Sequence, residues 1–169
     1  FNTWSISGGV DYMFSNGSFT GGAFGFSRLD SDFARDSGKL EADAQSLSAY
    51  YGTNWGRWSL TTNITGLRGT YEQSRVQIFQ ELAGGTAQTL EITQANADVD
   101  FSQFSGSVNL AYDLEFSQGK LRWLFQPQGQ FEFMSTDIDG FTESGDSDFL
   151  LEVDEQHLVT RSYSLGFLL

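Results

Sequence analysis

The sequence contains no cysteine and only one proline, and both facts narrow the class of protein. Without cysteine, neither disulfide bonds nor thiolate metal sites can form. A chain with one proline and 19 glycines is suited to extended structure with tight turns. These features exclude a disulfide-stapled domain and leave a strand-rich protein as the first expectation.

Basic residues and long apolar runs are also scarce. The chain has nine Lys and Arg residues but 22 Asp and Glu residues, and the resulting net charge of −13 argues against a nucleic-acid partner. No run reaches the ~18–20 apolar residues of a transmembrane helix. Strands of a membrane barrel need only ~9–11 alternating residues, and a mean hydropathy of −0.29 does not register alternation. A helical membrane protein is therefore excluded, whereas a β-barrel is not.

The sequence does contain period-two alternation, rich in aromatic residues. It predicts seven strands in a single domain spanning 1–169, with no helical segment of comparable strength. These strands lie at about 3–14, from Phe19 onward, 44–55, 58–65, 104–116, 122–133 and 162–169.

Each predicted strand has one apolar and one polar face. For a membrane barrel the apolar face meets lipid and the polar face lines the lumen. The residues predicted to face lipid are Trp4, Ile6, Val10, Tyr12, Phe24, Phe26, Leu47, Tyr51, Leu60, Ile64, Val108, Leu110, Tyr112, Leu114, Phe125 and Phe131. Those predicted to face the lumen are Asp11, Asn109, Asp113, Arg122, Gln126, Gln128 and Glu132.

The connections between these strands alternate in length. Residues 15–18, 56–57 and 117–120 have the chemistry of tight turns, whereas 29–43, 72–100 and 137–155 are long, polar and acidic. An up-and-down order places all short turns at one end of the sheet and all long connections at the other. Beside the short turns we expect an aromatic girdle at the membrane boundary, made of Phe14, Trp55, Trp58, Phe116 and Trp123.

Three features favour the membrane over water. The strands of about 11–13 residues exceed the five or six usual in globular sheets, the aromatics concentrate at strand ends, and lysine occurs only at Lys39 and Lys120. The predicted fold is all-β: a transmembrane, antiparallel, up-and-down β-barrel of the bacterial outer membrane, with its long loops extracellular.

Several segments resemble the translocator β-barrel of bacterial autotransporters, the type V secreted proteins. They are GGVDYMF at 8–14, GGAFGFSRLD at 21–30, LSAYYGTNWGRWSL at 47–60, DIDGFTESG at 137–145, LEVDEQ at 151–156 and RSYSLGFLL at 161–169. Their occurrence in one order along the chain is more specific than any single segment.

The resemblance implies a twelve-stranded barrel whose lumen holds a helical linker to an N-terminal passenger exported to the cell surface. Seven visible strands, without a linker or a terminal aromatic signal, suggest a central portion of such a barrel. The expected function is an outer-membrane translocator and anchor, without enzymatic activity or cofactor. Its expected partners are outer-membrane lipid and lipopolysaccharide, the barrel-assembly machinery, and its own passenger, linker or missing strands.

Two other functions fit the pattern. One is a small standalone outer-membrane barrel that acts as an adhesin or structural protein through its acidic loops. The other is a soluble, lipocalin-like protein that binds an apolar ligand. Mass of the native protein and solubility without detergent separate these from a translocator.

The candidate chemical groups are few. His157, near Asp154 and Glu155, is the only histidine, and we interpret it as a loop or strand-end residue rather than part of a catalytic triad. Asp11, Arg28, Asp113, Arg122 and Glu132 could form a charge network that contacts a linker in the lumen, but we prefer the simpler interpretation that they pair between strands and prop the barrel open. Two acidic groups are interpreted as solvated loops and not as metal sites: Asp30, Asp32, Asp36, Glu41 and Asp43, then Asp137, Asp139, Glu143, Asp146 and Asp148.

Overall fold

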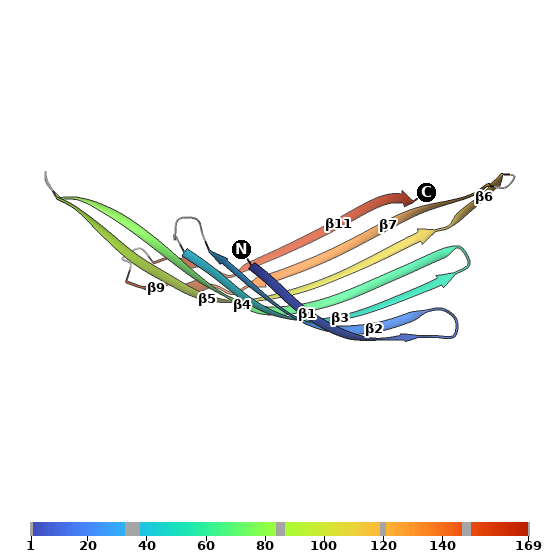
Figure 1. The fold of residues 1–169 in the computed structure, drawn as a ribbon, viewed down its shortest axis with the longest axis horizontal. Helices are drawn as coiled ribbons and strands as arrows, with labels where there is room; N and C mark the ends of the chain where they lie inside the picture. The colour runs from blue at the N-terminus through green and yellow to red at the C-terminus, as the bar shows by residue number, and fades with distance from the viewer. Residues whose placement is uncertain (1, 33–37, 84–86, 119–120, 147–149, 169) are drawn as a thin grey trace.

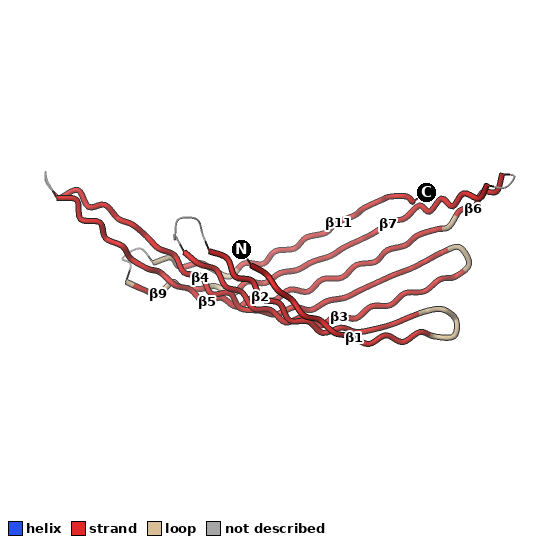
Figure 2. The backbone as a smooth tube through the Cα atoms, in the orientation of Figure 1, coloured by secondary structure: helices blue, strands red, loops and turns tan. Residues whose placement is uncertain are grey.

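A computed structural model describes residues 2–32, 38–83, 87–118, 121–146 and 150–168, and side chains within these ranges except those of 77–92 and 118. The described residues form strands and turns and contain no helix (Figure 2). Among them no helix is long and apolar enough to cross a membrane. The all-β prediction is therefore confirmed.

The long strands pair in the order β1-β2-β3-β4-β5-β7-β11, each antiparallel to its neighbours. Their bounds are β1 Asn2–Met13, β2 Phe19–Asp32, β3 Gly38–Trp55, β4 Trp58–Ala83, β5 Ala87–Tyr112, β7 Leu121–Ile138 and β11 Gln156–Leu168. The short β6 (Leu114–Gln118) continues β5 and pairs with β7. Three two-residue strands, β8 (Phe141–Thr142), β9 (Ser144–Gly145) and β10 (Glu152–Val153), lie in the connection from β7 to β11.

The sheet is an open, curved meander, and its two ends differ in the way predicted from the sequence (Figure 1). The turns after β1 and β3 and the end of β6 gather at one end, and the far ends of the β2–β3 and β4–β5 pairs lie with β9 at the other. Within the described residues, β1 and β11 each pair along one edge only. The sheet therefore has two exposed edges.

The predicted loops at 29–43 and 72–100 are wrong in the structure, because strands continue through most of both. Strand β2 runs to Asp32 and β3 begins at Gly38, while β4 and β5 remain paired from Trp58↔Tyr112 to Ala83↔Ala87. The period-two alternation persists there, since Ala95, Ala97 and Val99 alternate with polar residues. The polarity of these segments does not indicate a loop, because a strand outside a membrane can be polar on both faces.

The connection predicted at 137–155 is partly ordered by pairing. Strand β7 extends to Ile138, β8 pairs with β10, and β9 adds to the edge of β5 at Ala95↔Gly145. This segment covers part of β5, and most of the buried apolar side chains lie there: Ala95, Ala97 and Val99, which are 1–6% exposed. The buried core of the described chain is thus small and sits at the long-hairpin end.

Candidate membrane-spanning surface

The strand register defines two faces of the sheet, because residues directly opposite each other in an antiparallel pair share a face. We call one the aromatic face: it carries the register row Tyr12, Thr20, Tyr51, Thr62, Val108, Phe131 and Tyr163. All sixteen residues predicted to face lipid fall on it. Ring contacts such as Phe131–Tyr163, with centroids 5.0 Å apart, link neighbouring strands on this face.

The seven residues predicted to face a lumen fall on the opposite face. Asp11 lies across from Gly21, Asn109 across from Thr61 and Gln130, and Glu132 across from Ser107. Asp113 accepts a hydrogen bond of 2.6 Å from Gln126 Nε2 on that face. The alternation in the sequence therefore predicts two groups of residues, and the strand register places them on opposite faces of the sheet.

The apolar side chains of the aromatic face are left uncovered by the rest of the described chain. Val10 is 79% exposed, Leu47 67% and Leu165 92%. The accessible surface is 12506 Å², whereas a compact monomer of 18.8 kDa exposes ~8,300 Å². A contiguous apolar surface of this kind marks contact with a membrane or a partner.

The aromatic residues at the tight turns follow a line inclined to the strands. Thr20 pairs with both Tyr12 and Tyr51, so these two tyrosines lie at the same height along the strands. Toward the tight turns, Phe14 is two residues beyond Tyr12 and Trp55 is four residues beyond Tyr51, so Trp55 lies two residues further along than Phe14. Trp58 lies opposite Tyr112, and Phe116 is four residues further on. The line therefore advances six residues, ~20 Å, across four strand spacings, ~19 Å. That slope is about 45°, close to the tilt of strands in outer-membrane barrels.

The apolar band ends at a second line, which is inclined in the same sense as the first. Outermost on the aromatic face are Phe26 of β2, Leu47 of β3 and Phe104 of β5, each followed by a polar residue in the same face. On β4, Trp58 and Arg68 bracket the band, ten residues or ~33 Å apart along the strand. With a tilt of about 45° the band is ~23 Å high, which matches the ~25 Å apolar belt of outer-membrane barrels.

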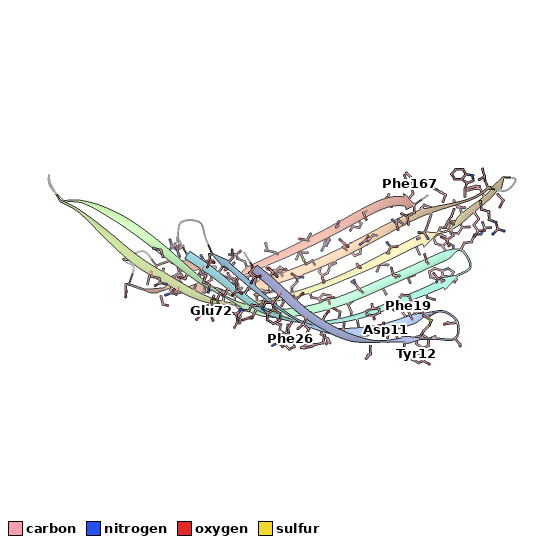
Figure 3. The ribbon with its side chains drawn as sticks, viewed as in Figure 1. Asp11, Tyr12, Phe19, Phe26, Glu72 and Phe167 are labelled. Carbon is pink, nitrogen blue, oxygen red and sulfur yellow. The ribbon has the colours of Figure 1, made fainter. Side chains whose placement is uncertain are left out.

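Beyond the apolar band the aromatic face becomes charged, and we call this region the charged margin. Its members are Arg28, Asp30, Glu41, Asp43, Arg68, Glu72, Asp98, Asp100, Asp137 and His157. In Figure 3, Phe26 and Glu72 lie toward this end, and Asp11 and Tyr12 lie near the tight turns.

The predicted lumenal charge network is wrong for Arg28. This residue lies in register with Trp4 and Asp43, on the aromatic face, because it shares the parity of Phe24 and Phe26 along β2. Its guanidinium nitrogens lie 3.3 Å from Asp30 Oδ1, 2.8 Å from Glu41 Oε2 and 3.5 Å from Asp43 Oδ2. Three acidic residues interpreted as part of a solvated loop, Asp30, Glu41 and Asp43, are therefore partly neutralised on strands. Asp36 and Asp148 lie outside the described residues.

A buried ion pair, missed by the sequence analysis, ties the β7–β11 connection to the sheet. Glu143 is 5% exposed, and its Oε2 lies 2.6 Å from Arg75 Nη2. Arg75 Nε donates to Oε1 at 3.2 Å, and the Leu151 N–H donates to Oε2 at 2.9 Å. Hydrogen bonding from Arg75 holds the pKa of Glu143 below its ordinary value, against the opposing effect of burial. In the sequence, the one feature that singles out Glu143 is its position within the DIDGFTESG segment.

Aromatic rings cover glycines on the opposite face, a second feature that the sequence alone did not show. A Cβ at Gly52 would collide with the Phe19 ring, and one at Gly21 with the Tyr50 ring. Both pairs join β2 to β3, where Phe19 lies opposite Gly52 and Gly21 opposite Tyr50. Only the register reveals which glycine faces which ring, so alternation within one strand could not predict them.

His157 does not meet a serine nucleophile in the described residues. Its Nδ1 lies 2.5 Å from Asp137 Oδ1, and both side chains are more than half exposed in the charged margin. The neighbour of Asp137 on its other side is Ser102, so the acid stands between serine and histidine. A catalytic triad needs the histidine in the middle. The described residues also bring no three His, Asp or Glu side chains together as a metal site.

Comparison with known proteins gives one family. Residues 1–169 match the family described as autotransporter beta-domain. The crystal structure of the beta domain of the Bordetella autotransporter BrkA resembles this chain with a TM-score of 0.33 and 12% identity, over 98% of this chain and 87% of that one. No curated protein matches the sequence.

Proposed function

The chain belongs to the autotransporter β-domain family, and we propose that its aromatic face is the surface that contacts membrane lipid. Family membership makes it a translocator and anchor of type V secretion, located in the bacterial outer membrane. The resemblance noted in the sequence is thereby confirmed.

One observation supports the proposal above the others: the apolar band has the slope and height expected for a barrel in an outer membrane. The strand tilt of about 45° comes from the register between Phe14 and Phe116, and the height of ~23 Å comes from that tilt and the separation of Trp58 and Arg68 on β4. A soluble lipocalin-like protein folds its apolar residues inward and has no reason to keep such a belt exposed.

We further propose that the two free edges pair with additional strands to close a twelve-stranded barrel. An unpaired edge in hydrocarbon leaves each backbone N–H and C=O unsatisfied, at several kcal/mol each. The opposite face, with Asp11, Asn109 and Glu132, then lines a hydrophilic lumen that tolerates a linker and a passenger. The long hairpins lie outside the cell, and assembly requires the barrel-assembly machinery.

The mechanism proposed is physical and not catalytic. The apolar band fixes the barrel in lipid, the hydrophilic lumen receives polypeptide, and the passenger reaches the surface through or with the folding barrel. The Asp137–His157 pair has an exposed position in the charged margin, and in the described part of the chain Asp137 lies between Ser102 and the histidine. A standalone adhesin remains the second candidate, supported by the length of the β4–β5 hairpin.

A matched pair of charge substitutions tests the proposal in the intact secreted protein. Leu110 lies mid-band on the aromatic face, and its neighbour Asn109 lies on the opposite face. We expect Leu110→Arg to cost ~2–4 kcal/mol of barrel stability and to reduce both heat-modifiable protein and surface-displayed passenger. Asn109→Arg should leave both nearly unchanged. Equal losses, or a larger loss at Asn109, would overturn the assignment of lipid to the aromatic face.

A further inference from the structure

A hollow of about 430 Å³ lies on the aromatic face where the apolar band meets the charged margin. Phe24, Leu47 and Phe104 line its band side. Gln45, Arg68, Ser102 and Asp137 line its margin side. The hollow is therefore amphipathic. In the proposed function its apolar half lies toward the membrane interior and its polar half toward the membrane surface.

A single glycine forms the apolar slot of this hollow. Gly66 lies in register between Leu47 and Phe104, whose side chains stand on either side of it. A Cβ built at Gly66 would meet no heavy atom within 4 Å. The missing side chain thus leaves a notch in the apolar band, flanked by a leucine and an aromatic ring.

Arg68 is the next residue of β4 on the same face and stands directly beyond the notch. It is exposed, and none of the ion pairs found among the described residues involves it. Arg28, by contrast, has three carboxylates around it. The carboxylate of Asp137, which also lines the hollow, is engaged by His157 at 2.5 Å. The guanidinium of Arg68 therefore offers its planar set of donors to an external anion.

The position of Arg68 matches that of two other arginines at the end of the band. Arg28 on β2 and Arg161 on β11 also lie on the aromatic face. From Arg28 through Arg68 to Arg161 the register advances six residues toward the tight turns over five strand spacings. That slope resembles the slope of the aromatic girdle, so the arginines stand at one depth, where lipid headgroups begin.

We propose that this hollow binds a phosphorylated glycolipid of the outer leaflet, with an acyl chain in the Gly66 notch and a phosphate on Arg68. Arginine pairs with phosphate oxygens through two parallel N–H donors, and Gln45 and Ser102, its register neighbours, can add hydrogen bonds. A soluble phosphate would leave the apolar half of the hollow unused. The inference rests on the proposed function, because it takes the long-hairpin end as extracellular.

The test uses the full-length protein in nanodiscs of phosphatidylcholine, with and without bisphosphorylated lipid A. Native mass spectrometry measures the lipid A retained. We expect Arg68→Gln to lower retention about tenfold, since a charge-assisted phosphate contact is lost. Gly66→Leu fills the notch without a backbone clash and should lower retention similarly. Arg161→Gln and Gly8→Leu are matched controls outside the hollow, Gly8 also having open space at its Cβ, and should change retention less than about twofold.

Two further arms distinguish the sources of phosphate. Dephosphorylated lipid A should be retained equally by the parent protein and Arg68→Gln, and inorganic phosphate should not displace lipid A. Equal losses for Arg68→Gln and Arg161→Gln would mean general attraction and would overturn the site, as would retention indifferent to both Arg68 and Gly66. Failure of the parent protein to enter the discs would instead count against the proposed function itself.

Discussion

At the scale of single residues, Gly52 shows why a barrel strand tolerates no side chain at certain positions. The Phe19 ring occupies the space that a Cβ at Gly52 would need. We expect Gly52→Val to destabilise the barrel by ~1–3 kcal/mol through overpacking, although valine favours strands elsewhere. Loss of heat-modifiable migration at a lower temperature measures the effect.

The double variant provides the control for this prediction. Replacing Phe19 with Leu in the Gly52→Val background frees space and should recover part of the lost stability. Gly8→Val, at a glycine with open surroundings, should change it little. A Gly52→Val protein as stable as its parent would show that the ring moves aside at no cost.

Glu143 gives a residue-scale prediction about pH. Its pKa is lowered in the folded protein, chiefly by hydrogen bonding from Arg75. The folded carboxyl therefore binds its proton more weakly than the unfolded one, so its stabilising contribution is full above the unfolded pKa. That contribution is lost as pH falls through the depressed folded value.

Hydrogen exchange can follow this contact. Amide protection of Ala95, Ala97 and Leu151 should fall as pH drops from ~6 to ~3, after correction for intrinsic exchange. In Glu143→Gln protection should be lower at pH ~6 and nearly independent of pH over that range. Asp146→Asn is the control and should behave like the parent. Unchanged protection in Glu143→Gln would contradict a role for the ion pair in holding the connection.

At the scale of elements, the β4–β5 hairpin extends well past the membrane margin at Arg68. Replacing residues 78–92 by an Asn-Gly turn keeps the Gln77↔Thr93 pair and should preserve membrane assembly. Removing Gly106 and Ser107 from within the apolar band is the control, because it shifts the band residues of β5 against β4. We expect normal heat-modifiable protein from the first change and little from the second. Failure of the trimmed hairpin to assemble would show that it acts in barrel formation.

How much could be predicted from the sequence differs between the two parts of each strand. Inside the apolar band, alternation separates Leu110 from Asn109 without any knowledge of the partner strand. Beyond the band, the polarity of residues such as Glu72 and Asp98 predicts loops where the structure has strands, because nothing there requires an apolar face. The sequence also shows the correct face of Arg28, because Arg28 is two residues from Phe26 and therefore lies on the same face of β2. Its charge alone suggests the lumen. The Arg75–Glu143 contact joins residues far apart in sequence, which no local pattern can reveal.

At the scale of the whole molecule, the aromatic girdle and the line of arginines enclose an inclined band of uncovered apolar surface. Both lines follow from strand register, and their separation on β4 corresponds to a height of ~23 Å. The central claim is that this band contacts lipid while the opposite face contacts water. A family assignment alone does not say which residues do so.

A nitroxide scan along β5 tests that claim most directly. Single cysteines at each position from 104 to 112, in a chain with no native cysteine, are labelled in the protein within outer-membrane vesicles. Collision with oxygen and with a water-soluble nickel chelate is then measured. We predict that 104, 106, 108, 110 and 112 favour oxygen and that 105, 107, 109 and 111 favour the nickel chelate. A scan without period two, or one with the two sets reversed, would contradict the account.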